Sequence, residues 1–169
     1  CFSQPKTYKD TRFSMDTTIS IEATGQNSEQ VKTAVDNSFR VFQEIANETD
    51  RYKDGSPKGL YQLNAHAGQG PSTVGSHLLL LADMAHKQNF SEFDITLAPL
   101  IDVWQKHSTA KTVPDNLEIA ASLALTGKDK FSVAPEKQTI TLAPGAALDL
   151  GAIAKGYAVD VAAAVLAED

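Results

Sequence analysis

A run near the C-terminal end of the chain has the residue types that bind phosphate. Residues 149–157 read Asp-Leu-Gly-Ala-Ile-Ala-Lys-Gly-Tyr, so small residues stand at the expected start of a helix and Lys155 follows one turn later. Free N–H groups at a helix N-terminus attract anions, and a lysine adds a positive charge for a phosphate. Neither the GxxxxGK[ST] spacing nor the GxGxxG spacing is present, which excludes both common nucleotide fingerprints. The same small residues would also let a helix start pack closely on a sheet, and both interpretations stay open.

Three acidic residues in the middle of the chain could provide acid–base chemistry. Glu92, Asp94 and Asp102 are near one another in the sequence. Two carboxylates in different environments can act as acid and base. Carboxylates at such a spacing more often only solvate a loop, so the spacing alone does not decide between the two interpretations.

Several other kinds of site find no support in the sequence. The single cysteine excludes an internal disulfide and a thiolate-cluster metal site, since each needs at least two cysteines. No serine stands in a GxSxG context, which leaves serine hydrolysis without support. The histidines have no metal-ligand spacing such as HExxH, so no zinc site is expected; they are His66, His77, His86 and His107.

The composition is that of a folded globular protein. The 169 residues are 42% hydrophobic, 21% charged and 7% aromatic, which excludes the collagen-like, coiled-coil and disordered classes. The formal net charge is −6 and the positive residues are not clustered, so we expect no nucleic-acid binding. No apolar run approaches the roughly 20 residues that a membrane-spanning helix needs.

The position of the one cysteine is informative. Cys1 is the first residue and is followed by a polar run, Phe-Ser-Gln-Pro-Lys-Thr-Tyr-Lys-Asp, which is how a mature bacterial lipoprotein begins. A lipid on Cys1 would attach a folded domain to a membrane without a spanning helix. The alternative is a chain that happens to start at a free cysteine. We expect residues 1–12 to be an N-terminal tether, with membrane attachment only through Cys1.

Hydrophobic periodicity predicts the elements that must position these side chains. Strict alternation over residues 13–23 predicts one half-buried strand. Apolar residues at helical spacing predict a helix over residues 28–47 and another over residues 76–88. Pro99 argues against a regular helix across residues 93–104.

The second half of the chain predicts two more helices and a hairpin. Pro114 is suited to the first turn of a helix that runs to Leu123. The strand-like runs 130–133 and 138–142 predict a β-hairpin, and the alanine-rich residues 152–166 predict a helix. With no internal repeat and no interdomain linker, this order predicts a mixed α+β domain.

Taken in order, these segments resemble the FAD:protein FMN transferases of the ApbE type, formerly described as thiamine-biosynthesis lipoproteins. Residues 148–160 read LDLGAIAKGYAVD, which looks like the family's highly specific DLGxIAKGYAVD signature. Residues 93–104, FDITLAPLIDVW, look like the family's FDPTVGPLVDLW. Residues 51–64 are similar to its Y-x-PDSELSRLN stretch, and Met15-Asp16-Thr17 takes the place of MGT. The resemblance covers nearly the whole chain.

The resemblance implies both a fold and an activity. The fold would be α+β and ApbE-like, related to T-folds, with a mixed sheet and flanking helices. The activity would be that of a periplasmic, membrane-anchored enzyme that splits FAD with Mg²⁺ and transfers FMN through a phosphoester to a threonine. The acceptor would be a flavoprotein subunit of a membrane redox complex. Residues 13–169 would form the N-terminal part of such a flavin transferase domain, without the family's C-terminal half.

The resemblance also implies roles for matching residues. Those expected to bind FAD or to line its flavin pocket are Met15, Tyr52, Glu92, Phe93, Asp94, Asp149 and Lys155. Met15 and Tyr52 would lie against the flavin itself. The backbone carbonyl of Ala152 would be a ligand of Mg²⁺. The catalytic acidic residue and the other metal ligands would belong to the family's C-terminal half, so no catalytic residue is assigned.

Three positions depart from the family pattern, and the length departs too. Asp16 stands for the glycine of MGT, Glu92 for a small residue before Phe-Asp, and Ile95 for the proline of FDPT. Family members are also much longer than 169 residues. Three alternatives therefore stay open: a half that binds flavin or a partner without turnover, an FAD pyrophosphatase, and a lipoprotein whose fold is reused for adhesion.

Overall fold

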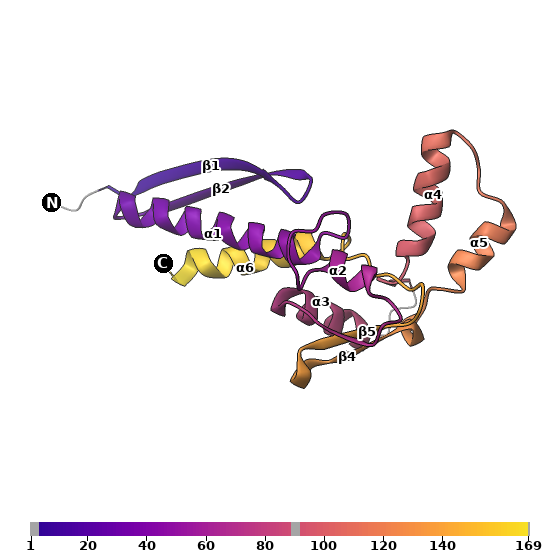
Figure 1. Cartoon of the computed structure of the whole chain (residues 1–169). Helices are drawn as coiled ribbons and strands as arrows, with labels where there is room; N and C mark the ends of the chain where they lie inside the picture. The colour runs from indigo at the N-terminus through magenta and orange to yellow at the C-terminus, as the bar shows by residue number, and fades with distance from the viewer. Residues whose placement is uncertain (1–3, 89–91, 169) are drawn as a thin grey trace. The chain divides into compact units, whose positions relative to one another are not determined.

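The structure is a computed structural model that describes residues 4–88 and 92–168 (Figure 1). The chain forms two compact units. One comprises residues 1–47 and 153–169, called here the α1 unit, and the other comprises residues 48–152, called the central unit. Cys1, with its expected lipid, lies outside the described residues. Within the described ranges, no helix is both long and apolar enough to cross a membrane.

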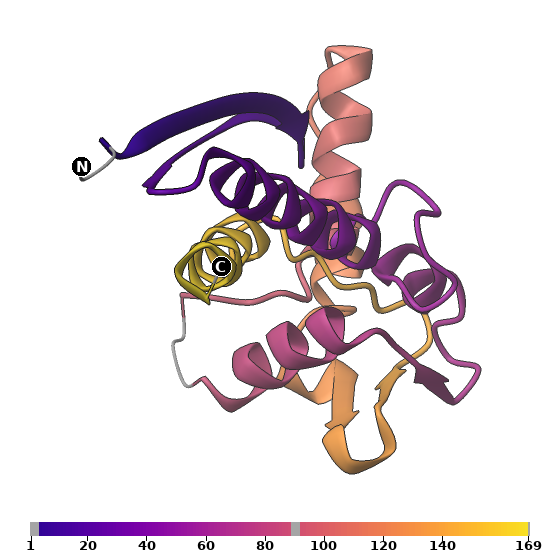
Figure 2. The ribbon, with the colours of Figure 1, turned by 90° about the vertical axis from the view of Figure 1, so that its left-hand side faces the viewer.

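The α1 unit packs a hairpin and a C-terminal helix against one long helix. Strand β1 (Lys6–Ser14) pairs antiparallel with β2 (Thr17–Gly25). Both strands lie along α1 (Ser28–Thr49), and α6 (Ala154–Glu168) lies beside α1 in both ribbon views (Figures 1 and 2). The buried core draws on β2, α1 and α6 and comprises Ile21, Val35, Phe39, Phe42, Ile45, Ala158 and Ala162.

The small residues of α6 allow a close approach to α1. Ala158 and Ala162 are buried against the aromatic and branched residues of α1. The hydroxyl of Ser38 shares its one proton between the carbonyl oxygens of Ala34, at 2.9 Å, and Ala162, at 3.2 Å. A contact of this kind between a side chain of one helix and the backbone of another requires a small residue at the crossing. The helices predicted over residues 28–47 and 152–166 are thus confirmed, with shifts of about two residues at their ends.

The N-terminal hairpin corrects two predictions. The single strand predicted over residues 13–23 is interrupted by a turn at Met15 and Asp16, both of which have positive φ, 52° and 55°. Residues 6–12, predicted as tether, belong to β1 and pair with β2. Two consecutive left-handed residues are typical of a type I′ hairpin turn, which glycine and asparagine usually signal. The turn was missed because methionine gives no such signal and because alternation continues on both sides of it.

The central unit is built from short elements. Its helices are α2 (Leu60–Ala65), α3 (Ser76–Lys87), α4 (Ala98–Ala110) and α5 (Asn116–Leu123), with 3₁₀ turns at Lys128–Lys130 and Pro135–Lys137. Its strands are β3 (Pro71–Thr73), β4 (Phe131–Ala134) and β5 (Thr139–Leu142), which form an antiparallel sheet in the order β3-β5-β4. Apolar residues between these elements are fully buried, among them Leu60, Leu78, Leu81, Ile140, Leu148 and Leu150.

The sequence predicted most of these elements, and prolines account for two of the differences. The β4–β5 hairpin and α3 are confirmed. Pro99 lies in the first turn of α4, where a missing N–H costs nothing, so the helix runs across a region where we expected none. Pro114 precedes α5, whose N-cap is Asp115 in a capping box with Glu118. The predicted phosphate-binding helix start is shifted as well, because α6 begins at Ala154 and Lys155 lies in its first turn.

The carboxylate of Glu48 lies at the N-terminus of α3. Glu48 is at the end of α1 but belongs to the central unit. Glu48 Oε2 accepts hydrogen bonds from the backbone N–H groups of His77, at 2.9 Å, and Leu78, at 3.2 Å. A negative side chain at this position satisfies donors that have no partner within the helix. Gly75, the N-cap residue, leaves the space for it, since a Cβ there would clash with the Glu48 carboxylate.

Candidate functional site

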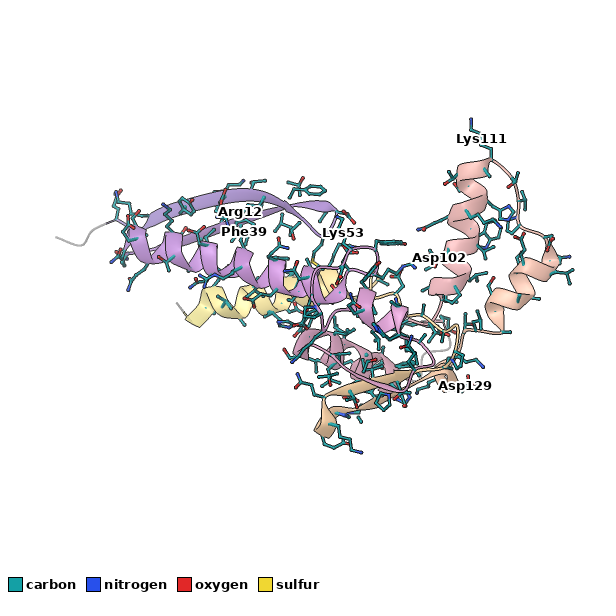
Figure 3. The ribbon with its side chains drawn as sticks, in the orientation of Figure 1. Arg12, Phe39, Lys53, Asp102, Lys111 and Asp129 are labelled. Atoms are coloured by element: carbon teal, nitrogen blue, oxygen red, sulfur yellow. The ribbon has the colours of Figure 1, made fainter. Side chains whose placement is uncertain are left out.

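The candidate site in the central unit is organised around Arg51, which follows the end of α1. Its side chain is only 7% exposed and contacts two carboxylates from distant parts of the chain. Arg51 Nη2 lies 2.8 Å from Asp102 Oδ1, and Nε lies 2.6 Å from Asp149 Oδ2. Asp102 is on α4, where Figure 3 labels it, and Asp149 follows β5. One guanidinium therefore links three segments of the central unit.

The electrostatics of this cluster keep Arg51 charged. Burial by itself lowers the pKa of Arg51, but the hydrogen bond and charge of Asp102, together with Tyr52 and Asp149, outweigh burial and raise the pKa above its ordinary value. The contact with Asp149 is an ion pair and not a well-aligned hydrogen bond, because the buried Nε–H does not point at a carboxylate oxygen. A buried cation is tolerated only when paired, and these two carboxylates provide the pairing.

Asp149 is fixed on both of its oxygens and at its backbone. Oδ1 accepts a hydrogen bond from the N–H of Gly151 at 2.7 Å, while Oδ2 faces Arg51. The backbone N–H of Asp149 donates to the carbonyl oxygen of Ile95 at 2.7 Å. Residues 148–152 and the FDIT segment are thus in direct contact. The carboxylate is part-exposed, at 21%, so it keeps a solvent-facing edge on which a ligand could bind.

Asn64 fixes the residue before Asp149. Its Oδ1 accepts the N–H of Leu148 at 2.9 Å, and its Nδ2 donates to the carbonyl oxygen of Leu148 at 3.0 Å. This side chain therefore acts as a strand partner for a single residue that lies outside the sheet. It satisfies both backbone groups of a buried segment, which would otherwise be without a partner at a considerable cost in free energy.

Asp94 has a local structural role in the same region. Its Oδ1 accepts the backbone N–H of Thr96 at 2.7 Å and the hydroxyl of Thr96 at 2.5 Å. The Thr96 side chain is fully buried and in turn accepts the N–H of Gly127 at 2.7 Å. Asp94 thereby fixes the turn that leads into α4 and brings Ile95 to the position where its carbonyl meets Asp149.

Tyr52 presents an exposed ring next to the buried arginine. The residue is 55% exposed, and the Arg51 guanidinium carbon lies 4.2 Å from the ring centre. The Tyr52 hydroxyl oxygen accepts hydrogen bonds from Arg51 Nη2 at 2.5 Å and from Gln105 Nε2 at 2.9 Å. A cation over an aromatic ring and two donors at its hydroxyl together restrict the orientation of the ring.

The other predicted site residues are distributed over both units. Phe93 is half-buried and Glu92 is exposed, both in the segment before α4. Met15, in the turn of the β1–β2 hairpin, and Lys155, exposed in the first turn of α6, belong to the α1 unit. The structure thus brings together Tyr52, Asp149 and the segment around Asp94 within one unit. It also brings in Asp102, which the sequence indicates only as a candidate acid or base.

The sequence interpretation missed the central role of Arg51. The residue stands beside Tyr52 in a segment that resembles the family, and this was its only sequence signal. Its carboxylate partners are far from it along the chain, so neither spacing nor periodicity could reveal the pairing. Asn64 was part of the matching stretch, but its contact with Leu148 depends on the tertiary fold.

The described residues do not form a complete magnesium site. Within residues 4–88 and 92–168, no group of three or more histidine, cysteine, aspartate or glutamate residues could hold a metal ion. The carbonyl of Ala152 is a hard oxygen ligand of the kind that Mg²⁺ accepts, but one such ligand does not make a site.

Comparison with known proteins places the chain in a family. The sequence model of the ApbE family matches residues 15–169. The chain belongs to the ApbE family. The solved structures agree on the fold: the flavin transferase ApbE from Vibrio cholerae has a TM-score of 0.82 at 26% identity, with 98% of this chain and 54% of that chain covered. The ApbE protein from Thermotoga maritima has a TM-score of 0.81 at 23% identity, with coverage of 96% and 53%. The predicted ApbE-like α+β fold is confirmed.

Curated relatives in the ApbE family carry a functional name. A protein of Klebsiella pneumoniae named FAD:protein FMN transferase is 35% identical over 72% of this chain and 40% of its own length. A protein of Vibrio cholerae with the same name is 29% identical over 81% of this chain and 41% of its own length. The chain therefore spans about 40% of the length of the curated relatives that it matches.

Proposed function

We propose that the whole protein is an FAD:protein FMN transferase that attaches FMN to a threonine of a partner flavoprotein. The observation that carries this proposal is the shared name of the two curated relatives, one of them 35% identical over 130 residues. The arrangement of Tyr52 and Asp149 in the central unit supports it, because both residues were expected at a flavin nucleotide site and the structure holds both against Arg51.

The proposed reaction is a phosphoryl transfer. The threonine hydroxyl oxygen forms a bond to the phosphorus of the FMN half, the bond from that phosphorus to the bridging pyrophosphate oxygen breaks, and AMP leaves. The hydroxyl proton passes to a base. We propose that this base is the acidic residue expected in the family's C-terminal half, which the chain does not span. Catalysis of this kind depends mainly on positioning and on stabilisation of charge at the phosphates.

The described residues would bind and orient FAD. The exposed ring of Tyr52 offers a flat surface for the flavin. Met15 would also lie against the flavin, and Glu92, Phe93 and Asp94 would line the flavin pocket. The fixed carboxylate of Asp149 accepts hydrogen bonds, so its ligand partner must be a donor. Lys155 would add positive charge near a phosphate.

We also propose that the reaction depends on Mg²⁺. When bound, the ion would neutralise the charge that develops on the pyrophosphate. The Ala152 carbonyl would supply one ligand. The remaining ligands would come from the family's C-terminal half, which the chain does not span. Addition of EDTA to the complete protein should abolish transfer, and Mg²⁺ should restore it. Full activity in EDTA would contradict the proposed Mg²⁺ dependence.

The transferase proposal is tested with the complete protein, FAD and a threonine-bearing acceptor flavoprotein. Mass spectrometry should find an FMN adduct on the acceptor, and AMP should be released in equal amount. Asp149→Ala and Lys155→Ala should weaken transfer, whereas the matched controls Asp129→Ala and Lys111→Ala, at exposed positions labelled in Figure 3, should not. AMP without an adduct would identify a pyrophosphatase, and bound FAD without AMP would identify a binding module.

The location of the protein is a separate proposal. We propose that it lies on the periplasmic side of a bacterial membrane, held by a lipid on Cys1, where its acceptor is a flavoprotein subunit of a membrane redox complex. The polar run that follows Cys1 supports this. The mass of the natural mature protein should exceed that of its amino acids by the mass of the acyl chains, and Cys1→Ser should release it from membranes. An unmodified Cys1 would contradict this proposal and leave the transferase proposal intact.

A further inference from the structure

We propose that Arg51 is a positioning residue for the flavin nucleotide: held between Asp102 and Asp149, it orients the Asp149 carboxylate and the Tyr52 ring, which are the groups that contact the ligand. The inference rests on the proposed function, because it assigns a role within the same site. Arg51 itself is nearly buried, with 7% of its side chain exposed, so it acts through its neighbours.

The contacts around residue 51 require a guanidinium group, and a lysine ammonium could not make all of them. The guanidinium is planar and carries several N–H groups in fixed directions. Here it reaches Asp102 at 2.8 Å, Asp149 at 2.6 Å and the Tyr52 hydroxyl at 2.5 Å, and it also stacks over the Tyr52 ring at 4.2 Å. A lysine ammonium would keep the charge but could not make all of these contacts at once.

The effect on Asp149 follows from how its two oxygens are held. Oδ1 is fixed by the N–H of Gly151, and Oδ2 is directed by the charge of Arg51. Without Arg51, Asp149 would keep one hydrogen bond and would lose its opposite charge in a site that is only 21% exposed. Such a carboxylate is free to rotate toward water. That rotation removes an oriented acceptor from the site.

This arrangement also limits which part of the nucleotide meets Asp149. An aspartate carboxylate accepts hydrogen bonds and repels a phosphate. The charges of Arg51, Asp102 and Asp149 sum to one negative charge, so the cluster as a whole does not attract an anion. Its ligand partner is therefore a hydroxyl, amino or ring N–H group of FAD, and the phosphates lie elsewhere.

The test is a double-mutant cycle on FAD binding to the complete protein, measured by titration of flavin fluorescence. Arg51→Ala should raise the Kd for FAD by at least about tenfold, and Arg51→Lys should recover part of that loss. In an Asp149→Asn background, the same Arg51→Ala change should raise the Kd by no more than about twofold, because the charge of Asp149 is already absent and only the contact with Tyr52 is left for Arg51 to act through. Arg40→Ala, an exposed arginine of α1, is the matched control and should leave the Kd unchanged.

The outcomes separate this inference from the proposed function. Wild-type protein that binds no FAD would overturn both. Wild-type binding with no loss in Arg51→Ala would overturn the positioning role alone. An equal loss in both backgrounds would also overturn it, because a merely structural arginine weakens binding whether or not Asp149 is charged. If Arg51→Ala fails to fold, the Arg51→Lys variant decides in the same way: a loss of FAD affinity that is clearly smaller in the Asp149→Asn background supports the inference, and a loss that is absent or equal in both backgrounds overturns it.

Discussion

The α1 unit is held together by apolar packing between long elements, whereas the central unit is fixed around its site by hydrogen bonds from side chains to backbone. In the α1 unit, Phe39, Phe42 and Ile45 are buried against β2 and the alanines of α6. In the central unit, Asn64 fixes Leu148, and Asp94 fixes Thr96. Apolar packing is non-directional, while hydrogen bonds set the position of individual atoms. The difference indicates that stability and the geometry of the site can be disturbed separately.

The largest expected effect is on the packing of the α1 unit. Phe42→Ala should lower the free energy of unfolding by about 3–5 kcal/mol, because a side chain that is 4% exposed would leave a cavity. Unfolding in guanidinium chloride measures this. Val159→Ala, at a 56% exposed position of α6, is the control and should change it by less than about 0.5 kcal/mol. Similar losses in the two variants would mean that the core does not depend on Phe42.

A smaller effect is expected at the hydrogen-bonded residue Asn64. Asn64→Ala should cost about 1–3 kcal/mol, because it leaves the N–H and carbonyl of Leu148 without a partner. It should also weaken FAD binding, since Asp149 is the next residue. Asn116→Ala, on the exposed first turn of α5, serves as the comparison. Unchanged FAD affinity in Asn64→Ala would show that the backbone contact does not position Asp149.

A gain in stability is expected at the hairpin turn. Asp16→Gly should raise the free energy of unfolding by about 0.5–1 kcal/mol, because Asp16 has a φ of 55° and glycine adopts this conformation at less cost. The change also restores the family's MGT pattern. Asp16→Ala should instead lower stability. Thermal unfolding of the two variants side by side checks the sign, and a loss in Asp16→Gly would show that the Asp16 side chain stabilises the turn.

The smallest effect is expected from acid at the contact between α4 and α5. Glu118 accepts from Lys106 and from the N–H of Asp115 and faces His107, which lowers its pKa from the ordinary value of 4.5. Because the folded state lowers this pKa, the contribution to stability is complete above pH 4.5 and is lost as the pH falls through the lowered value. The fluorescence of Trp104, the single tryptophan and part of α4, reports the change. Glu118→Gln should remove this acid transition, and its persistence would assign the transition to another group.

Features that follow from a local pattern could be predicted from the sequence, whereas contacts between distant residues could not. The long helix α1 follows from periodicity sustained over many residues, and the β4–β5 hairpin follows from two short strand-like runs. The hairpin turn at Met15 did not, because neither residue of that turn is a glycine or an asparagine. At the site, Asp149 was identified through a specific motif. Arg51 could not be, because a buried cation is recognised by its partners, and Asp102 and Asp149 meet it only in the folded chain.

The cap on α3 gives Gly75 a role that backbone torsion does not explain. Its φ of −68° and ψ of 162° are open to any residue, so glycine is needed there only for space. Even a methyl group would displace the flexible end of Glu48 and would not force the backbone apart. The helix would then lose the anion that the chain itself supplies and present its free N–H groups to solvent. A substitution as small as Gly75→Ala would thus change the electrostatic character of one end of α3 with no new charge in the sequence.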